Sequence, residues 1–143
     1  MSDLSVDVVK GSGLNHLLLL VEDNPDDQYM VKRVLREVVN LKIDLAENGL
    51  EAIEYLKSHE SELPHLIFLD VKMPHMGGME ALCLIREFEA LKYLPIIIFS
   101  SSCEPSDIAE AMSCNATEYV QKPVDFDRYN QTVRELVKRY MGI

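Results

Sequence analysis

Polar residues suited to phosphoryl-transfer chemistry follow four short apolar runs of this chain, each where a buried strand would end. In chain order these residues are Glu22 and Asp23, Asp70, Ser100, and Lys122. If the runs are neighbouring parallel strands, their carboxyl ends place three carboxylates, a hydroxyl and an ammonium group in one crevice, which is where open α/β sheets bind ligands. The sequence therefore predicts a ligand site at one edge of a parallel sheet.

The three carboxylates of this set need a cation. Each like-charge pair a few ångströms apart costs about 4 kcal/mol at an effective dielectric near 20, so the three groups cannot all stay ionised unaided. Two adjacent acids on one strand and a third on the next, Asp70, offer the oxygen-rich, incomplete shell that Mg²⁺ prefers. A solvated acidic rim would be the default interpretation of Glu22 and Asp23 alone. The polar residues at the other strand ends disfavour it, and we expect a Mg²⁺ site.

The elements that must position these residues alternate along the chain. The expected strands are Leu17 to Val21, Ile43 to Ala46, Leu66 to Leu69, Ile96 to Phe99, and Tyr119-Val120. The helices expected between and after them carry apolar stripes at helical spacing: Val31, Val34, Leu35 and Val38; Leu50, Ile53 and Leu56; Met79, Leu82 and Ile85; Ile108, Ala111 and Met112; and Phe126, Tyr129, Val133, Leu136, Val137 and Tyr140. Five strands alternating with five helices predict an α/β fold in which a parallel sheet is covered on both faces.

Several residues mark where the helices begin and end. Asn24 can cap the first helix, with Pro25 at its first position, and Asn48-Gly49 is interpreted as a turn or a cap before the second. Pro105 suits the start of the fourth helix, and Asn115 can end it in the left-handed region.

Composition limits the classes of function. The 143 residues suffice for one domain of common size. Aspartate and glutamate number 24 against 14 lysine and arginine, a net charge of -10 that argues against direct nucleic-acid binding. The apolar stretches are strand-sized and follow no charged leader, so we expect neither a signal peptide nor a membrane partner, and a cytoplasmic location.

Cysteine and histidine give no sign of a metal or disulfide framework. Cys83, Cys103 and Cys114 are odd in number and lack CxxC spacing, so we interpret them as small apolar residues. The four histidines have no metal-ligand spacing and are interpreted as surface residues. Residues 1–15 show little periodicity, and the Gly11-Ser12-Gly13 triplet precedes the first strand, so a flexible lead-in is expected there and not a phosphate loop.

The whole pattern resembles the receiver domain of response regulators, the CheY-like phosphoacceptor module, over about His16 to Tyr140. The segments that carry this resemblance are Val21-Glu22-Asp23, Leu69-Asp70 with Met73-Pro74 and Gly78, Ile98-Phe99-Ser100-Ser101, and Glu118-Tyr119-Val120-Gln121-Lys122-Pro123. The resemblance implies a flavodoxin-like, doubly wound (βα)5 fold with strand order 2-1-3-4-5. We expect the receiver domain to cover residues 16–143 and, because only a few residues follow the last helix, we expect no output domain.

The same resemblance assigns the phosphoacceptor role to Asp70, which would take a phosphoryl group from a sensor histidine kinase or a histidine phosphotransfer protein. Asp23 and Asp70 would bind Mg²⁺ directly, Glu22 directly or through water, and Lys72 through its backbone carbonyl. Such a protein is a phosphoacceptor with slow self-dephosphorylation and not an enzyme in the usual sense. Phosphoryl transfer depends on in-line positioning and charge neutralisation more than on a general base, which suits this set of residues.

Further roles follow from the resemblance. Lys122 would neutralise phosphoryl charge, and Ser100 would bond a phosphoryl oxygen and draw the following loop inward. Tyr119 would be the aromatic switch residue, although an ordinary half-buried strand tyrosine is an equal alternative. Lys72 and Ser102 occupy the two positions that flank the approach of the hydrolytic water, and Lys72 could instead extend into solvent.

The resemblance also predicts a cis Lys122-Pro123 bond. Glu22 stands where aspartate is commoner in the family, and Gly77 where aspartate or asparagine is frequent; neither departure removes the phosphoacceptor chemistry. The Val21 to Asp27 motif looks like that of single-domain receivers associated with bacteriophytochrome-type kinases.

Three competing interpretations remain to be weighed. A haloacid-dehalogenase-type phosphatase needs a second aspartate two residues after its nucleophile, where this chain has Lys72. A flavodoxin-like FMN carrier needs a hydroxyl-rich and glycine-rich loop after the first strand, where this chain has an acidic one that repels phosphate. A degenerate receiver acting only as a binding platform is disfavoured by the complete set Asp23, Asp70, Ser100 and Lys122. The expected output is a switched protein-binding surface for an unidentified downstream protein.

Overall fold

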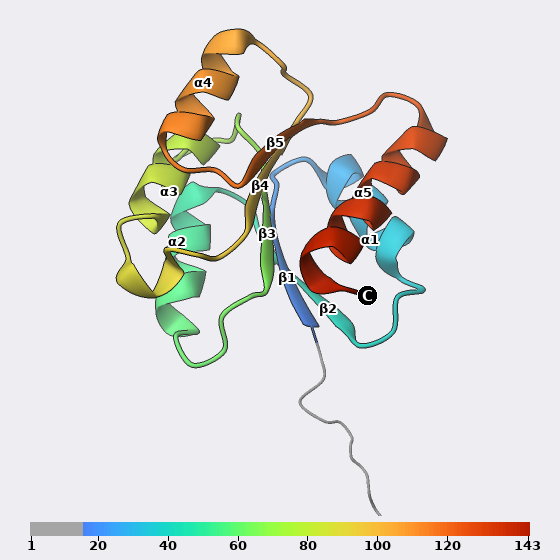
Figure 1. Ribbon diagram of the computed structural model, residues 1–143, viewed down its shortest axis with the longest axis horizontal. Helices are drawn as coiled ribbons and strands as arrows, with labels where there is room; N and C mark the ends of the chain where they lie inside the picture. Colours follow the sequence, from blue (N-terminus) through green and yellow to red (C-terminus); the bar gives the residue numbers. More distant parts are fainter. Residues whose placement is uncertain (1–15) are drawn as a thin grey trace, which may run out of the picture.

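The computed structural model describes residues 16–143, in which five strands alternate with five α-helices (Figure 1). The expected lead-in, residues 1–15, lies outside the described residues. The elements are β1 (His16–Val21), α1 (Pro25–Leu35), β2 (Leu41–Ala46), α2 (Gly49–Ser58), β3 (Leu66–Leu69), α3 (Gly78–Ile85), the 3₁₀ turn η1 (Glu89–Leu91), β4 (Ile96–Ser100), α4 (Pro105–Ser113), β5 (Glu118–Gln121) and α5 (Phe126–Met141). Each expected strand and helix is present.

All neighbouring strands of the sheet are parallel, in the order β2-β1-β3-β4-β5. The chain runs outward from β1 to β2 and then crosses back to β3 on the other side of β1. The connections that leave the carboxyl ends of β1 and β3 therefore run in opposite directions, although the two strands are neighbours. The expected flavodoxin-like fold and strand order are therefore confirmed. This arrangement creates the crevice predicted from the sequence, since ligands bind at such reversal points.

Helices cover both faces of the sheet. Figure 1 shows α2, α3 and α4 on one face and α1 and α5 on the other. Side chains of successive strand residues point to opposite faces, and β3 shows the result: Ile67 and Leu69 belong to the core under α2 and α3, whereas Leu66 and Phe68 belong to the core under α1 and α5. The central strands are continuous apolar runs because both of their faces are buried.

The helix termini agree with the sequence. The side chain of Asn24 accepts hydrogen bonds from the backbone N–H groups at the start of α1, and Asn48 accepts one from Glu51. Pro105 is the first residue of α4, and Asn115 has φ 65°, the left-handed conformation predicted for it. Capping fixes where α1 begins, which in turn fixes the path of the chain just after Glu22.

Three residues of the expected stripes are exposed. Leu50 is 46% exposed, Met112 is 47% exposed and Phe126 is 37% exposed, so none of them belongs to the core. In α2 the buried face is shifted to Ala52, Ile53 and Leu56. Each misplaced residue lies at the border of an apolar stripe, where the 3.6-residue period alone does not decide which side chain meets the sheet.

The interpretation of the cysteines also needs correction. Cys83 of α3 and Cys114, the residue after α4, form a disulfide with a Cα–Cα distance of 5.1 Å, although 31 positions separate them in sequence. Only Cys103 remains a free thiol among the described residues. The two cysteines meet because α3 packs against α4. A contact between two helices leaves no local spacing motif in the sequence, so this pair could not be predicted from cysteine spacing.

In residues 16–143, no helix combines the length and the apolar character needed to cross a lipid bilayer.

Candidate phosphoryl-transfer and metal site

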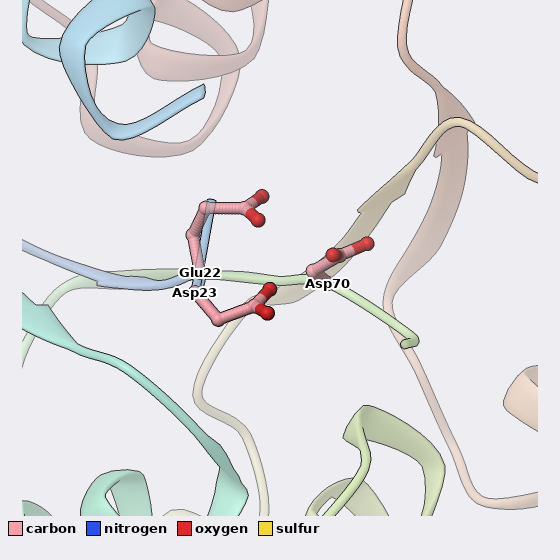
Figure 2. A group of neighbouring side chains, drawn as sticks. All are labelled: Glu22, Asp23 and Asp70. Atoms are coloured by element: carbon pink, nitrogen blue, oxygen red, sulfur yellow. The ribbon is translucent and has the colours of Figure 1, made fainter. Parts of the chain in front are cut away.

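The three predicted carboxylates meet at the carboxyl ends of β1 and β3 (Figure 2). Carboxylate oxygens of Glu22, Asp23 and Asp70 all lie within 4.8 Å of one another. Glu22 is only 2% exposed, Asp23 is exposed, and Asp70 is intermediate. The register explains the meeting, because Val21 of β1 pairs with Leu69 of β3, so the residues that follow them emerge side by side.

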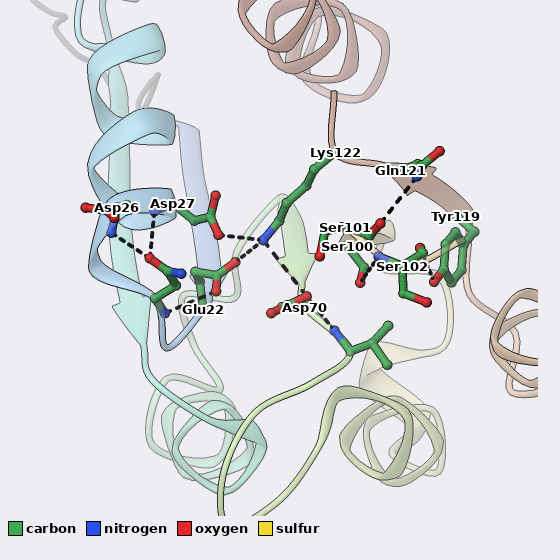
Figure 3. A network of polar contacts seen from close by, with 12 residues as sticks. Glu22, Asp26, Asp27, Asp70, Ser100, Ser101, Ser102, Tyr119, Gln121 and Lys122 are labelled. Atoms are coloured by element: carbon green, nitrogen blue, oxygen red, sulfur yellow. Dashed lines mark hydrogen bonds and ion pairs between the residues drawn. The ribbon is translucent and has the colours of Figure 1, made fainter. Parts of the chain in front are cut away.

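Lys122 is the cation nearest this cluster (Figure 3). Its Nζ lies 2.7 Å from a carboxylate oxygen of Glu22, 3.0 Å from one of Asp27 and 4.0 Å from Oδ1 of Asp70. The lysine side chain is only 9% exposed. One ammonium group thus faces three buried or half-buried acids, with Asp23 as a fourth nearby, so the site carries an excess of negative charge.

The charge excess appears in the ionisation of the acids. Burial, together with the nearby Asp70, raises the pKa of Glu22 to about 7 even though it bonds Lys122. Burial also raises the pKa of Asp70, against the opposing attraction of Lys122. Burial alone would lower the pKa of Lys122, but its bond to Glu22 and the charge of Asp70 more than offset this, so the pKa of the ammonium group is raised. The cluster therefore binds a further cation or retains protons.

Asp70 is held in place by the backbone around it. Its Oδ1 accepts a hydrogen bond from the N–H of Val71 at 2.8 Å. Gly78, at the start of α3, passes so close that a Cβ there would lie 1.9 Å from the carbonyl oxygen of Asp70. Only glycine allows this approach, and the N–H of Gly78 bonds the carbonyl of Val71 at 2.9 Å. The turn after β3 therefore fixes the orientation of the Asp70 carboxylate.

A second group of polar contacts leads from the site toward α4 (Figure 3). Ser100 is 2% exposed, and its Oγ accepts a hydrogen bond from the N–H of Ser102 at 3.2 Å. The Tyr119 hydroxyl donates to the carbonyl of Ser102 at 2.8 Å, and burial raises the pKa of this hydroxyl. The Ser102 hydroxyl donates to Asp107 of α4 at 2.9 Å. Tyr119 is thus half-buried against the loop that links Ser100 to α4.

The site opens to solvent through a cleft of about 610 Å³. The exposed Lys72 lines this cleft. The other lining residues are Glu22, Asp23, Asn24, Pro25, Asp26, Asp27, Asp70, Ser100, Ser101 and Lys122. Ser102 points away from the cleft, since its hydroxyl bonds α4. The structure therefore brings all predicted site residues except Ser102 and Tyr119 to one opening, and those two lie immediately behind it.

The Lys122-Pro123 bond is trans, because the described residues contain no cis peptide bond. The prediction of a cis bond is therefore wrong. The Lys122 N–H bonds the carbonyl of Ser100 at 2.7 Å, which continues the sheet ladder, and from that backbone position the side chain reaches Glu22. The trans connection already aims the lysine into the site.

Sequence reasoning missed Asp27 as a member of the site. Asp27 lies in the first turn of α1, where the helix dipole favours a negative charge, and its carboxylate also accepts a hydrogen bond from Lys122. A further support is Asn24, whose N–H donates to Glu22 at 3.2 Å. The available signal was their position in the turn that directly follows the acidic pair, which brings the first turn of the helix over the strand end.

Comparisons with known proteins agree with this geometry. A sequence model of the response regulator receiver domain matches residues 18–134. The chain is 29% identical over 130 residues to a probable methanogenesis regulatory protein, FilR2, of Methanothrix harundinacea, with 88% of this chain and 84% of that protein covered. It is 34% identical over 116 residues to the two-component response regulator ARR17 of Arabidopsis thaliana, with 75% of each covered. It spans 52% of the response regulator Rre1 of Synechocystis, at 32% identity.

Solved structures give the same result. The phosphorylated cyanobacterial phytochrome response regulator RcpA superimposes with a TM-score of 0.83 at 26% identity, covering 89% of this chain and 94% of that one. The Mn²⁺-bound form of the response regulator Rcp1 shares the fold, with a TM-score of 0.80 at 24% identity over 90% of this chain and 96% of that one.

Proposed function

This chain belongs to the response regulator receiver domain family, a family of two-component signalling proteins, and we propose that it acts as a phosphoacceptor. Asp70 takes a phosphoryl group from the phosphohistidine of a sensor histidine kinase or a histidine phosphotransfer protein. The phosphorylated protein then presents an altered surface to a downstream protein.

One observation carries the proposal: the Asp70 carboxylate lies in an open cleft beside both the acidic pair and an ammonium group. Its oxygens are within 4.8 Å of oxygens of Glu22 and Asp23, and Nζ of Lys122, which bonds Glu22, lies 4.0 Å from Oδ1 of Asp70. A carboxylate in this position can attack phosphorus while Lys122, and a metal ion that the carboxylates would hold, neutralise the charge of the phosphoryl oxygens.

The donor set fits Mg²⁺. Three carboxylates with a single ammonium partner leave negative charge uncompensated, and hard oxygen ligands open to solvent suit an ion that keeps several waters. Asp23, Asp70 and Glu22 would hold the ion together with the backbone carbonyl of Lys72. When bound, Mg²⁺ supplies positive charge to the oxygens of the transferring group.

The residues of the chain have separable tasks in the transfer. An oxygen of Asp70 forms the new bond to phosphorus as the bond from phosphorus to the imidazole nitrogen breaks, which leaves an acyl phosphate. Lys122 turns from Glu22 and Asp27 toward the phosphoryl oxygens, which carry more negative charge than a single carboxylate. Ser100 exchanges its bond from the Ser102 N–H for a bond to a phosphoryl oxygen, and the loop that contains Ser102 shifts with it.

Tyr119 responds to that shift because its hydroxyl bonds the carbonyl of Ser102. When the loop moves, the ring loses this partner or follows it. The surface formed by the loop, α4 and β5 therefore changes shape with the state of Asp70, and it is the surface we propose for the downstream protein.

The donor kinase is proposed to be of the phytochrome type. The support is the Val21 to Asp27 motif together with the similarity to RcpA, a phytochrome response regulator. Phosphotransfer from a panel of purified kinases tests this, and preferential transfer from a kinase of another type would contradict it.

The phosphoacceptor assignment is tested with a small phosphodonor and Mg²⁺, followed by intact-mass measurement. The wild type should gain one phosphoryl group, and Asp70→Asn none. Asp26→Asn is a matched control, because it makes the same change on the rim of the same cleft. Equal labelling of Asp70→Asn and wild type would overturn the proposal.

A further inference from the structure

The helix α4 is held at its two ends by contacts of different kinds. Its carboxyl-terminal end is tied covalently, because Cys114 forms the disulfide with Cys83 of α3. Arg86, one helical turn beyond Cys83, reinforces that end by donating from Nε to the carbonyl of Asn115 at 2.9 Å. The carboxyl-terminal end of α4 is therefore fixed to α3, which lies beside it on the same face of the sheet (Figure 1).

The amino-terminal end of α4 has no covalent tie within residues 16–143, and a hydrogen bond links it to the loop that follows β4. Glu104 occupies the N-cap position and makes no side-chain cap hydrogen bond. The side chain of Asp107 accepts from the hydroxyl of Ser102, whose N–H in turn donates to Ser100. A change at Ser100 can therefore pass through two hydrogen bonds to the first turn of α4.

The tie at the carboxyl-terminal end of α4 limits how the helix can respond when its amino-terminal end is displaced. A helix that is free at its carboxyl-terminal end can shift as a body when its first turn is displaced, whereas a helix tied there must pivot or bend. Bending a packed helix costs free energy. The state of the disulfide should therefore set how easily α4 follows a change at the phosphoacceptor site.

The chemistry of the pair is reversible. A thiolate such as that of reduced glutathione attacks one sulfur and releases the other as a thiolate; a second thiol then resolves the mixed disulfide. The S–S bond gains two electrons and two protons, and two glutathione molecules are oxidised to their disulfide. Cys83 and Cys114 are both partly exposed, so a small thiol can reach them.

We propose that Cys83 and Cys114 form a redox-responsive modification site that, when oxidised, ties α3 to α4 and weakens the response of α4 to phosphorylation. The existence of the site is independent of the proposed function, whereas its effect on the response rests on it. Thiol-rich compartments keep such pairs reduced, and disulfides that form there are commonly sensors. Reduction releases α4 and favours the phosphorylated state.

The first test measures the pair itself. Cys103→Ser removes the remaining free thiol of the described residues and leaves Cys83 and Cys114 in place. This variant is equilibrated in buffers of increasing ratio of oxidised to reduced glutathione, denatured in acid and labelled with a maleimide. Labelling should fall from two thiols to none within the series. Two labelled thiols at every ratio, or none at every ratio, would overturn the proposal.

A second measurement reports on structure without using the phosphoacceptor site. The closed loop of 31 residues predicts a melting temperature about 10 °C higher in the oxidised than in the reduced protein. The double variant Cys83→Ala, Cys114→Ala should melt at the same temperature in both buffers. A redox-dependent shift that persists in the double variant would contradict the assignment to these two residues.

The third test couples the pair to phosphorylation. Binding of beryllofluoride, a phosphoryl mimic, is measured with Mg²⁺ for oxidised and reduced Cys103→Ser protein and for the same protein carrying the two alanine substitutions. We expect about fivefold tighter binding in the reduced protein, the lower end of the range for coupled sites, and the alanine variant should match it in either buffer.

Equal affinity of the oxidised and reduced forms would overturn the coupling. If neither form binds beryllofluoride, the proposed function fails, while the labelling and melting results still decide whether the redox pair exists.

Discussion

Two cationic side chains, Lys122 and Arg86, occupy opposite ends of the sheet and differ in what surrounds them. At the carboxyl ends of the strands, Lys122 faces the carboxylates of Glu22, Asp27 and Asp70. At the other end, Arg86 faces neutral acceptors. It donates to the backbone carbonyls of Leu91, Lys92, Leu94 and Asn115 and to the hydroxyl of Thr117.

We call Arg86 the brace, and the end of the sheet that carries Lys122 and the proposed phosphoacceptor the reactive end. The guanidinium of Arg86 has fixed planar geometry and holds the loops before β4 and β5 by several bonds that need no change of partner. Lys122 is a flexible point charge among more acids than it can neutralise, so its partners can be replaced by other anions. The partners of Arg86 can therefore stay fixed, whereas the partners of Lys122 can be exchanged.

The largest expected effect removes a carboxylate from the reactive end. Asp23→Ala should reduce phosphorylation by a small phosphodonor with Mg²⁺ by about 100-fold or more, because the proposed metal site loses a charged ligand. The fold should persist, and metal-free thermal stability should stay equal or rise, since one like charge is gone from the cluster. Intact-mass labelling and thermal unfolding in a chelator measure both quantities. Transfer that proceeds at the same rate with and without divalent metal would refute the metal assignment.

Removal of the Arg86 side chain should have the reverse effect: a loss of stability with little change in phosphorylation. Arg86→Ala should lower the free energy of unfolding by about 3 kcal/mol, because it leaves half-buried carbonyls without donors. Phosphorylation of the folded protein should change by less than about threefold, since Arg86 contacts no group of the site. Urea unfolding and the labelling assay measure these effects. Exposed Arg134→Ala on α5 is the control, and an equal loss of stability there would contradict the special role of Arg86.

The next effect is a pH dependence that belongs only to the reactive end. Burial raises the pKa of Glu22 from 4.5 to about 7, so between these values the folded protein retains a proton that the unfolded chain has lost. Stability without metal should therefore fall as pH rises through this window, by at most about 3 kcal/mol. Glu22→Gln, which cannot ionise, should flatten the fall. Urea midpoints in chelator across this range measure it, and a rise of wild-type stability through the window would show the sign to be wrong.

The smallest effect concerns the lifetime of the phosphorylated form. Lys72 is exposed at the cleft and can lie across the approach of the hydrolytic water, whereas the hydroxyl of Ser102 bonds Asp107 and cannot position that water. Lys72→Asn should speed loss of phosphate by about two- to fivefold, and addition of Ser102→Glu should speed it further. Loss of phosphate is followed by mass after removal of the donor. Unchanged or slower loss in both variants would refute the idea.

The sequence predicted the reactive end well because its positions are set by strand ends. Each run of buried apolar residues ends at a residue that can be read from the sequence. Parallel pairing of the strands then brings Glu22, Asp70, Ser100 and Lys122 to the same edge of the sheet. The fold was predicted for the same reason, since each run is bounded by a cap or turn residue such as Asn24.

The contacts of Arg86 and the pairing of Cys83 with Cys114 were not predicted, because residue type alone does not indicate them. Arg86 bonds mainly backbone carbonyls, which every residue carries, and Cys83 meets Cys114 only after two helices have packed. The prediction that Leu50 is buried was wrong for a related reason, since a small rotation of a helix decides whether a residue at the border of its apolar stripe is buried. The Lys122-Pro123 bond is trans, unlike the expectation drawn from the family, and the sheet ladder orients the lysine without a cis bond.

The position of β5 has a further consequence. It pairs with β4 alone, and its residues are at most half-buried, whereas β3 is fully buried between two partners. Amide hydrogens of β5 should therefore exchange with solvent through local opening, while those of β3 wait for global unfolding. The strand that carries Tyr119 and leads into Lys122 can thus adjust without disturbing the hydrogen bonds of the sheet interior.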